Sequence, residues 1–363
     1  MNCWDYYSAT IDNLIWHPTL ADSSLRTRVE ERLSGTLLQS LVIADRADIP
    51  ADLAHARTIH VVPGNRADFG RCPGTPGQLC CNYLTLDLYV GCTIGCSYCI
   101  MQSYLRNRTL EVRVPGVETI GPIIELIRKN PTRRLRFGTG EVGDSLLFDP
   151  LFDLSRDLIR SVADEENVRF ELKTKTDYVD HLLDISHGGN TVIAFSLNPQ
   201  AVIDTEEGYA ATLDARLDAA ERVLDAGYPV AFHFDPIIRI ESWQEQYGAV
   251  IRRLARFGGR AVEWVSLGTL RYPPTLRRWI EKRPYSLDEF VEAKDGKMRY
   301  LQAVRLEMYR FAKRGLATAL PDVPTYLCME SAAVWRNIPR VDSDRSLDTI
   351  MRPIPGFERR GRM

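Results

Sequence analysis

The sequence predicts an α/β protein built around a partial (β/α)6 TIM-like barrel, with extensions at both ends of the chain. Strand-like and helix-like patterns alternate between residues 82 and 270, which is typical of a parallel sheet with right-handed crossovers. The alternation gives about six β/α units, and a complete TIM barrel needs eight. Polar or small residues stand at the end of each expected strand, whereas the strand bodies are mostly apolar. A binding site is therefore expected at the carboxyl edge of the sheet.

The elements of this barrel follow one another in a regular order. The expected strands are 83–90, 133–139, 168–175, 191–197, 230–235 and 262–269. The expected helices between them are 117–130, 150–165, 179–187, 213–226 and 242–257. In the helix 213–226, apolar residues such as Leu213, Leu217 and Val223 recur at helical spacing. Gly227 predicts its end, because glycine readily takes the left-handed conformation of a helix C-cap.

The chain is expected to have three regions. They are an N-terminal accessory region, 1–80, the barrel, 81–271, and a mainly helical C-terminal region that covers the barrel mouth, 272–363. The accessory region contains an amphipathic helical pattern at 23–33 and short strand-like runs at 41–43 and 59–62. A long helical pattern from 287 to 314 dominates the C-terminal region.

Composition limits the class of protein. The 363 residues are 45% apolar and 26% charged, and no apolar run approaches the length of a membrane span. The start of the chain lacks the basic and apolar segments of a signal peptide, so a cytoplasmic protein is expected. The net charge of −2 gives no general attraction to nucleic acid, so any such partner requires a local basic patch.

The most informative motif is the C-x3-C-x2-C run of Cys92, Cys96 and Cys99. Three thiolates on one tight loop can bind three irons of a 4Fe–4S cluster. Residues 100–327 contain no cysteine, so the fourth iron is expected to be open to an exogenous ligand. The alternative is a zinc loop or three buried thiols. Structural zinc requires four protein ligands, and no C-x2-C or H-x3-H partner lies nearby.

This loop resembles that of the radical S-adenosylmethionine (SAM) superfamily, and the segments after it narrow the resemblance to spore photoproduct lyases and their relatives. The segments are 92–105, Thr174-Lys175 followed by 179–183, Phe195-Ser196-Leu197-Asn198, and Ala226-Gly227-Tyr228-Pro229. The resemblance covers residues 80 to 270. It implies a radical SAM barrel in which the SAM amine and carboxylate bind the open iron. It also implies reductive cleavage of SAM to methionine and a 5′-deoxyadenosyl radical, which abstracts a hydrogen atom from the substrate.

The resemblance and the strand ends together suggest cofactor contacts, each with a structural alternative. Glu141 is expected to accept hydrogen bonds from the SAM ammonium, or else to be a solvated turn carboxylate. Lys175 matches the family lysine that pairs with the SAM carboxylate, the alternative being a surface lysine. Ser196 and Asn198 suit the ribose hydroxyls or the carboxylate of SAM, or they close a turn. Tyr98 stands between two cluster ligands, in a packing role or a radical-relay role.

Three further strand-end residues are less specific. Asp144 fits a capping role and a role in the site equally well. His233 and Asp235 are expected to face the pocket by their position alone.

One departure from the lyases concerns the quenching of the product radical. In that family a cysteine on the loop after the second strand returns a hydrogen atom to the product. Residues 138–145 contain no cysteine here, and Glu141 stands roughly where it would fall. Cys328, on a strand-like segment after the barrel, is the expected substitute donor if the segment folds over the barrel mouth. The alternative is a buried free cysteine.

Two other features remain open. Cys72, Cys80 and Cys81 flank a Pro/Gly-rich stretch and suit buried thiols or a redox pair better than a second cluster, because adjacent residues cannot easily face one metal. Residues 252–283 carry nine basic side chains against two acidic ones, Glu263 and Glu281. This run fits either a phosphate-binding surface or a solvated helix face.

Three functional hypotheses follow. The first, which the missing loop cysteine favours, is a radical SAM enzyme that modifies a C–H bond of a nucleoside-like or other small metabolite by epimerisation, dehydrogenation or rearrangement. The second is repair or modification of a DNA or RNA base. The third is a non-catalytic iron–sulfur protein. Either enzyme would use a 4Fe–4S cluster, SAM and an external electron donor such as flavodoxin or ferredoxin.

Overall fold

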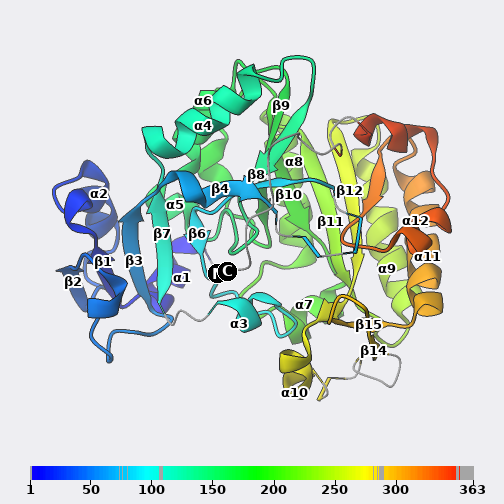
Figure 1. The fold of residues 1–363 in the computed structure, drawn as a ribbon, viewed down its shortest axis with the longest axis horizontal. Coiled ribbons are helices and arrows are strands. Elements are labelled where there is room, and N and C mark those ends of the chain that lie inside the picture. Colours follow the sequence, from blue (N-terminus) through cyan, green and yellow to red (C-terminus); the bar gives the residue numbers. More distant parts are fainter. Residues whose placement is uncertain are drawn as a thin grey trace.

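The computed structural model describes residues 2–72, 74–75, 77–79, 81–105, 109–280, 282–283, 285, 290–348 and 351. Its main sheet has the strand order β16-β12-β11-β10-β9-β8-β5-β4, and all its strand pairs are parallel except β4 with β5. The sheet is curled, since Arg136 on β8 bonds Tyr326 on β16, far along the strand order (Figure 1). The predicted partial barrel is confirmed.

The six expected strands are present. They are β5 (Leu84–Leu86), β8 (Leu135–Gly138), β9 (Val168–Thr174), β10 (Thr191–Ser196), β11 (Val230–Ile237) and β12 (Val262–Thr269). Two strands extend the sheet beyond the prediction, β4 (Phe69–Arg71) and β16 (Thr325–Leu327). Because β16 runs parallel to β12, the residue after it, Cys328, reaches the same edge of the sheet as the other strand ends.

The first expected strand, 83–90, differs from the prediction because it is divided between two sheets. After β5 the chain crosses into an N-terminal sheet as β6 (Tyr89–Val90). That sheet has the order β2-β1-β3-β7-β6, with strands β1 (Asn13–Trp16), β2 (Gln39–Val42), β3 (Thr58–Pro63) and β7 (Leu110–Val114). Beside it lie α1 (Cys3–Thr10), α2 (Ser24–Arg32) and the short 3-10 turns η1 (Pro18–Leu20), η2 (Arg46–Asp48) and η3 (Arg66–Asp68).

Helices cover the outer face of the curled sheet (Figure 1). The helical segments between β7 and β13 include α4 (Val117–Arg128), α5 (Asp149–Phe152), α6 (Ser155–Val162), α7 (Gln200–Glu206), α8 (Leu213–Asp225), α9 (Trp243–Arg253) and the 3-10 helix η5 (Leu254–Phe257). The expected helix 150–165 is interrupted because Asp153 takes a left-handed conformation. The prediction of a helix over 179–187 is wrong, since only the 3-10 turn η4 (Asp180–Leu182) forms there.

The described part of the C-terminal region contains strands as well as the expected helices. It contains η6 (Pro274–Leu276), α10 (Arg277–Ile280), a small sheet of β13 (Arg271–Tyr272), β14 (Phe290–Glu292) and β15 (Met298–Tyr300), then α11 (Gln302–Ala319), α12 (Ala332–Arg336) and η7 (Asp342–Leu347). Of the helix expected over 287–314, residues 287–289 lie outside the described residues, and the helix that the structure describes starts at Gln302. Before it, Asp295-Gly296 turns the chain into a hairpin, with Gly296 at φ of +73°.

The interior of the curled sheet holds apolar and charged side chains together. Val192, Ala194, Ala231, Trp264 and Tyr326 form a buried cluster separate from the main core. Arg136 and Glu171, both nearly inaccessible, form a salt bridge in the same interior. The cavity described below opens above these residues.

No helix among the residues placed by the structure is both long and apolar enough to cross a membrane.

Candidate active site

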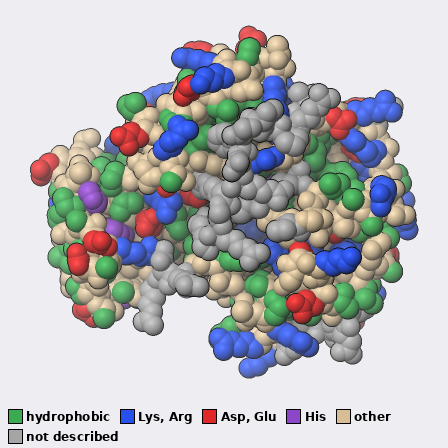
Figure 2. All heavy atoms as spheres, in the orientation of Figure 1, with side chains coloured by type: hydrophobic (Ala, Val, Ile, Leu, Met, Phe, Trp, Pro, Cys, Tyr) green, Lys and Arg blue, Asp and Glu red, His purple; other side chains and the backbone are tan. Residues whose placement is uncertain are grey.

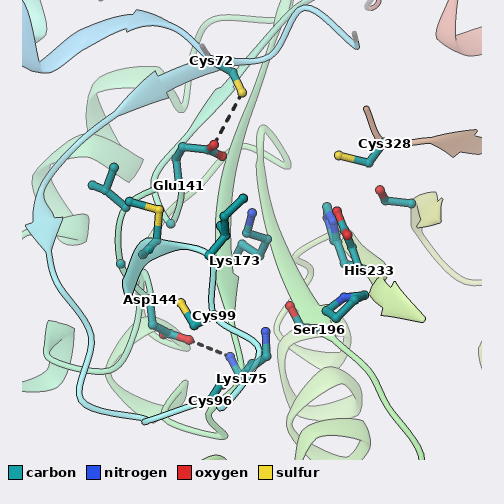
Figure 3. Close-up of a pocket in the computed structure, with 18 of the residues that line it drawn as sticks. Cys72, Cys96, Cys99, Glu141, Asp144, Lys173, Lys175, Ser196, His233 and Cys328 are labelled. Atoms are coloured by element: carbon teal, nitrogen blue, oxygen red, sulfur yellow. Dashed lines mark hydrogen bonds between the residues drawn. The ribbon is translucent and has the colours of Figure 1, made fainter. Parts of the chain in front are cut away.

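One cavity of about 260 Å³ at the carboxyl edge of the sheet brings most of the predicted site residues together (Figure 3). The predicted residues that line it are Cys92, Cys96, Tyr98, Cys99, Glu141, Asp144, Lys175, Ser196, His233, Asp235 and Cys328. Asn198 lies outside this lining, buried behind the cysteine loop.

The cysteine loop, residues 91–100, connects β6 to α3 (Met101–Tyr104). Gly91 has φ of +96°, and a Cβ there would lie 2.8 Å from Leu110 Cδ2, so the loop begins at a position that requires glycine. The carbonyl of Cys96 accepts hydrogen bonds from the Cys99 backbone, at 3.1 Å, and from Gln102 Nε2, at 2.7 Å. Cys92, Cys96 and Cys99 all line one cavity.

The donor set of this loop suits a cluster better than a single ion. Within the described part of the chain, no three His, Cys, Asp or Glu side chains are placed to hold one metal ion. Three thiols of one short loop that line one cavity are a donor set that suits a 4Fe–4S cluster. A structural zinc ion requires four protein ligands.

A buried pair of charges anchors the cysteine loop from behind. Glu207 and Arg216 form a salt bridge in which both side chains are fully inaccessible. Glu207 also accepts hydrogen bonds from the Tyr98 hydroxyl and from Asn198 Nδ2, the latter at 2.8 Å. Tyr98 and Asn198 are therefore bound to the Glu207–Arg216 pair, which supports the packing alternative for Tyr98.

The turn after α7 touches the cysteine loop directly. Tyr209 N donates to the carbonyl of Ile94 at 2.8 Å, and Ser97 N donates to the carbonyl of Glu206 at 2.8 Å. A Cβ on Gly208 would lie only 2.1 Å from the Ile94 oxygen, so this close approach requires glycine. Sequence inspection missed these contacts, and the Glu206-Glu207-Gly208 run at the end of a helix was the available signal.

Asp144 has a structural role. Its carboxylate accepts hydrogen bonds from the backbone of Leu146 and Leu147, both at 3.0 Å, and from the backbone N–H of Lys175 at 2.7 Å. The same carboxylate accepts a bond from Thr174 Oγ1 at 2.8 Å. Asp144 thus caps the segment that follows it and fixes the backbone of Lys175.

Lys175 and Glu141 occupy different parts of the cavity (Figure 3). Lys175 Nζ lies 5.9 Å from the centre of the Tyr98 ring, beside the cysteine loop. Burial alone would lower the pKa of Lys175, but the neighbouring Cys96 and Glu207 hold that pKa above its usual value. Glu141 Oε1 accepts a hydrogen bond from the Cys72 thiol at 3.6 Å. The sequence alone does not indicate this contact, because it depends on β4 pairing with β5.

A charged group lies on the cavity floor. Glu171 accepts hydrogen bonds from Arg136 Nη2 at 2.9 Å and pairs with His233 Nε2 at 2.7 Å. The Arg136 guanidinium lies over the rings of Trp264 and Tyr83, 4.2 Å and 4.7 Å from their centres. Burial would raise the pKa of Glu171, but Arg136 and His233 hold it well below its usual range.

Cys328 lies at the mouth of the curled sheet, as the donor hypothesis requires. Its sulfur accepts a hydrogen bond from Arg271 Nη2 at 3.7 Å, and both Arg271 nitrogens contact Asp235. Burial and the Asp235 carboxylate raise the pKa of Cys328 well above its usual value, so the thiol keeps its hydrogen at neutral pH. Cys72 and Cys81 also line the cavity, whereas Cys80 lies outside the described residues.

The basic run divides into two parts. Acidic side chains of α8 neutralise its first part, through the pairs Arg253–Asp214, Arg256–Asp218, Arg256–Glu221 and Arg260–Asp225. Around α10, by contrast, Arg277, Arg278 and Lys282 are exposed, and Trp279 is 58% exposed. Figure 2 shows the basic side chains gathered at the lower edge of the molecule. The solvated-helix interpretation thus holds for the first part.

Comparison with known proteins agrees with this geometry. A curled parallel sheet with three thiols of one loop at its carboxyl edge defines a barrel of the radical SAM type. The chain belongs to the spore photoproduct lyase family, because the family's model, described as spore photoproduct lyase, matches residues 80–300.

Individual relatives give the extent of the similarity. The chain is 31% identical over 206 residues to the spore photoproduct lyase of Geobacillus sp. (strain Y412MC61), covering 54% of this chain and 59% of that one. It is 30% identical over 165 residues to the spore photoproduct lyase of Bacillus subtilis (strain 168), covering 45% of this chain and 48% of that one. The chain thus spans only half to three-fifths of the length of these relatives.

The fold similarity extends further than the sequence similarity. A spore photoproduct lyase variant with bound AdoMet and dinucleoside spore photoproduct superposes with a TM-score of 0.74 at 22% identity. The match covers 89% of this chain and 99% of that structure. The two proteins share their fold.

Proposed function

We propose that the protein is a radical SAM enzyme, with a 4Fe–4S cluster held by Cys92, Cys96 and Cys99. The observation that carries this proposal is the convergence of these three thiols and the charged Lys175 in one cavity. When bound, the cluster supplies the electron that cleaves SAM to methionine and a 5′-deoxyadenosyl radical, which abstracts a substrate hydrogen atom. Thiolates of one loop leave the fourth iron without a protein ligand from that loop.

The chain's own residues would orient SAM beside the loop. Lys175 would pair with the SAM carboxylate, and Ser196, at the end of the neighbouring strand, would contact the carboxylate or a ribose hydroxyl. Glu141 would accept a hydrogen bond from the SAM ammonium, while its Oε1 accepts one from the Cys72 thiol. Asn198 is bound to Tyr98, Glu207 and Tyr247, so its contribution is to hold the loop that carries the cluster.

The substrate that these features support best is a nucleoside-like molecule. A relative of the same fold holds a dinucleoside spore photoproduct. In this chain residues 138–145 contain no cysteine, so the product radical is quenched differently from the lyase route or rearranges. We therefore favour C–H modification of a nucleoside-like or other small metabolite, by epimerisation, dehydrogenation or rearrangement. The thiols favour a reducing compartment, the cytoplasm, with a flavodoxin or ferredoxin as electron donor.

A second candidate function, action on a base within DNA or RNA, has one observation in its favour. The exposed basic residues of α10 lie close to the cysteine loop, since Ser103 Oγ of α3 contacts Thr275 Oγ1 at 3.0 Å. Basic side chains with an exposed tryptophan suit phosphates and a stacked base. Salt separates the candidates, because binding to nucleic acid weakens steeply as salt rises and binding of a neutral nucleoside does not.

SAM cleavage tests the main proposal. Protein reconstituted with iron and sulfide under anaerobic conditions, then given SAM and dithionite, should release 5′-deoxyadenosine, even slowly and without substrate. The Cys96→Ala variant should release none. A parent protein that binds iron but never cleaves SAM would leave only the third hypothesis, a non-catalytic iron–sulfur protein.

A further inference from the structure

The cysteine loop has an outer side that faces away from the cavity. Ile94, Cys96 and Tyr98 line the cavity, whereas Gly95 and Ser97, which alternate with them, do not. Gly95 is exposed to solvent. A cluster bound by this loop can therefore be approached from two sides, through the cavity and from the outer side of the loop.

The segment that follows α10 packs against the outer side of the loop. The hydroxyl of Tyr285 lies 3.4 Å from Ser97 Oγ, and Ser97 is the neighbour of Cys96. Both hydroxyls donate to the Glu206 carboxylate, Tyr285 at 3.0 Å, and Arg283 Nη1 pairs with Glu206 Oε1 at 3.5 Å. None of Ser97, Glu206, Arg283 and Tyr285 lines the cavity. These contacts fix α10 behind the loop that carries the thiols.

The surface of α10 is basic and carries one large aromatic side chain. Arg277, Arg278 and Lys282 are exposed, and Trp279 is 58% exposed. The guanidinium carbon of Arg278 lies 5.1 Å from the centre of the Trp279 ring. Among the described residues, no salt bridge joins Arg278 or Lys282 to a partner. This surface therefore suits a partner with acidic side chains, since opposite charges steer two proteins together.

The position of α10 favours a partner that delivers an electron over one that delivers a substrate. A substrate must enter the cavity, because the hydrogen atom is abstracted there under the proposed function. An electron needs only a partner close to the cluster, and α10 is fixed to the side of the loop that does not line the cavity. Electron-transfer encounters also use small interfaces, below about 1,200 Å², which one short surface segment can provide a large part of.

We propose that the exposed side chains of Arg277, Arg278, Trp279 and Lys282 form the docking surface for a small acidic one-electron carrier protein of the flavodoxin type. The basic side chains attract the carboxylates of the carrier, and Trp279 packs within the contact. One electron passes from the carrier to the cluster, so the carrier is oxidised by one electron and the cluster is reduced by one. This assignment rests on the proposed function and locates its electron donor.

Binding of flavodoxin tests the surface directly. Fluorescence anisotropy of a labelled, oxidised flavodoxin is followed as the reconstituted protein is added. The parent should bind, and the double variant Arg277→Glu/Arg278→Glu should bind at least about tenfold more weakly, because it reverses the charge that attracts the carrier. Trp279→Ala should also weaken binding, although it changes no charge. A parent that does not bind flavodoxin, or a double variant that binds it as the parent does, would overturn the proposal.

A matched control separates local docking from overall charge. Arg128→Glu/Lys129→Glu makes the same change of charge on α4, where both side chains are about 70% exposed; the structure gives 71% for Arg128 and 70% for Lys129. This control should bind flavodoxin as the parent does. If it loses as much affinity as the α10 variant, the net charge of the protein governs binding and the α10 surface is not the docking site.

A change of reductant gives a second readout. Dithionite is a small reductant that needs no docking surface, whereas reduced flavodoxin must form a complex. The α10 double variant should release 5′-deoxyadenosine at least about tenfold more slowly than the parent with flavodoxin, and at the parent's rate with dithionite. A variant that is equally slow with both reductants, or equally fast with both, refutes a docking role for α10.

The remaining outcomes assign the surface to another partner or reject the proposed function. If the α10 variant loses affinity for a labelled single-stranded oligonucleotide but keeps its affinity for flavodoxin, the surface binds nucleic acid and the carrier proposal is wrong. If the parent holds iron and cleaves SAM with dithionite but does not bind flavodoxin, the docking surface is wrong and the radical SAM proposal stands. If the parent neither holds iron nor cleaves SAM with dithionite, the proposed function itself fails.

Discussion

The cysteine loop supplies its three thiols from one short segment, whereas the wall across the cavity takes its polar side chains from β8, β9, β10, β11 and β12. The two sides also differ in support. Glu207 and Arg216 hold the loop from behind, while salt bridges inside the curled sheet hold the side chains of the wall. Under the proposed function these are two tasks: a compact motif would set the position of the cofactor, and a dispersed surface would contact the substrate.

The largest effect is expected when a thiol of the cysteine loop is removed, because the cluster should then be lost. The reconstituted parent should hold about four irons per chain, and Cys92→Ala, Cys96→Ala and Cys99→Ala should each abolish the cluster. Iron analysis and the visible absorption spectrum measure it. Cys3→Ala is the matched control, since Cys3 is on α1, outside the cavity lining. A full cluster in any of the three loop variants would contradict the assignment of ligands.

The next effect comes from the support of the loop. Glu207→Gln leaves Arg216 charged and buried, which should lower the free energy of unfolding by about 3–5 kcal/mol and reduce the iron bound. Denaturant titration provides the measurement. Glu165→Gln, which breaks an exposed pair with Arg128, should cost less than about 1 kcal/mol. Equal effects of the two variants would show that the buried pair does not anchor the loop.

A smaller effect is expected for the SAM contacts between the two sides. Lys175→Ala and Glu141→Ala each remove a charged partner and should weaken SAM binding by roughly 1.5–3 kcal/mol. Equilibrium dialysis with labelled SAM measures the change, and Lys129→Ala, at an exposed site on the outer surface, is the control. If both variants bind SAM as the parent does, the contacts proposed for Lys175 and Glu141 are wrong and the cluster assignment is unaffected.

The smallest effect is expected for Cys328→Ala, which should change the product of the reaction and leave the cleavage of SAM unchanged. Cys328→Ala should cleave SAM normally but give a changed product or uncoupled 5′-deoxyadenosine, because a thiol S–H bond is weaker than most C–H bonds. In deuterium oxide the parent's product should gain one solvent deuterium, and the Cys328→Ala product none. Cys81→Ala is the matched control, since Cys81 lines the same cavity. Normal turnover by Cys328→Ala would leave Cys328 as a packing residue.

The sequence predicted the loop side well, because its signal is local. Cys92, Cys96 and Cys99 define the motif by spacing alone, and the six strands around it follow from their pattern. On the wall across the cavity, the sequence predicted only the residues at the strand ends, such as Ser196 and His233. The alternating charges of β9 at Arg169, Glu171 and Lys173 resemble a solvent-facing strand, and only the curled sheet shows that Glu171 faces inward to Arg136.

Contacts between distant segments could not be predicted. The bond between Cys72 and Glu141 depends on β4 joining the sheet, and the position of Cys328 depends on β16 extending it beside β12. The same limit applies to charge. Arg256 belonged to a basic run in the sequence, yet α8 supplies Asp218 and Glu221 to neutralise it. The partners of these side chains depend on which helices and strands pack together, and a short run of sequence does not specify that packing.

The close approach of Gly208 to Ile94 has a consequence for substitutions that lie far from the cysteines in the sequence. The turn after α7 braces the cysteine loop through backbone hydrogen bonds from Tyr209 N to the Ile94 carbonyl and from Ser97 N to the Glu206 carbonyl, both at 2.8 Å. A side chain at residue 208 would meet the Ile94 oxygen at 2.1 Å, so the turn and the loop would have to move apart. Because Ile94 stands between Cys92 and Cys96, a change at residue 208 would alter the spacing of thiols more than a hundred residues away along the chain.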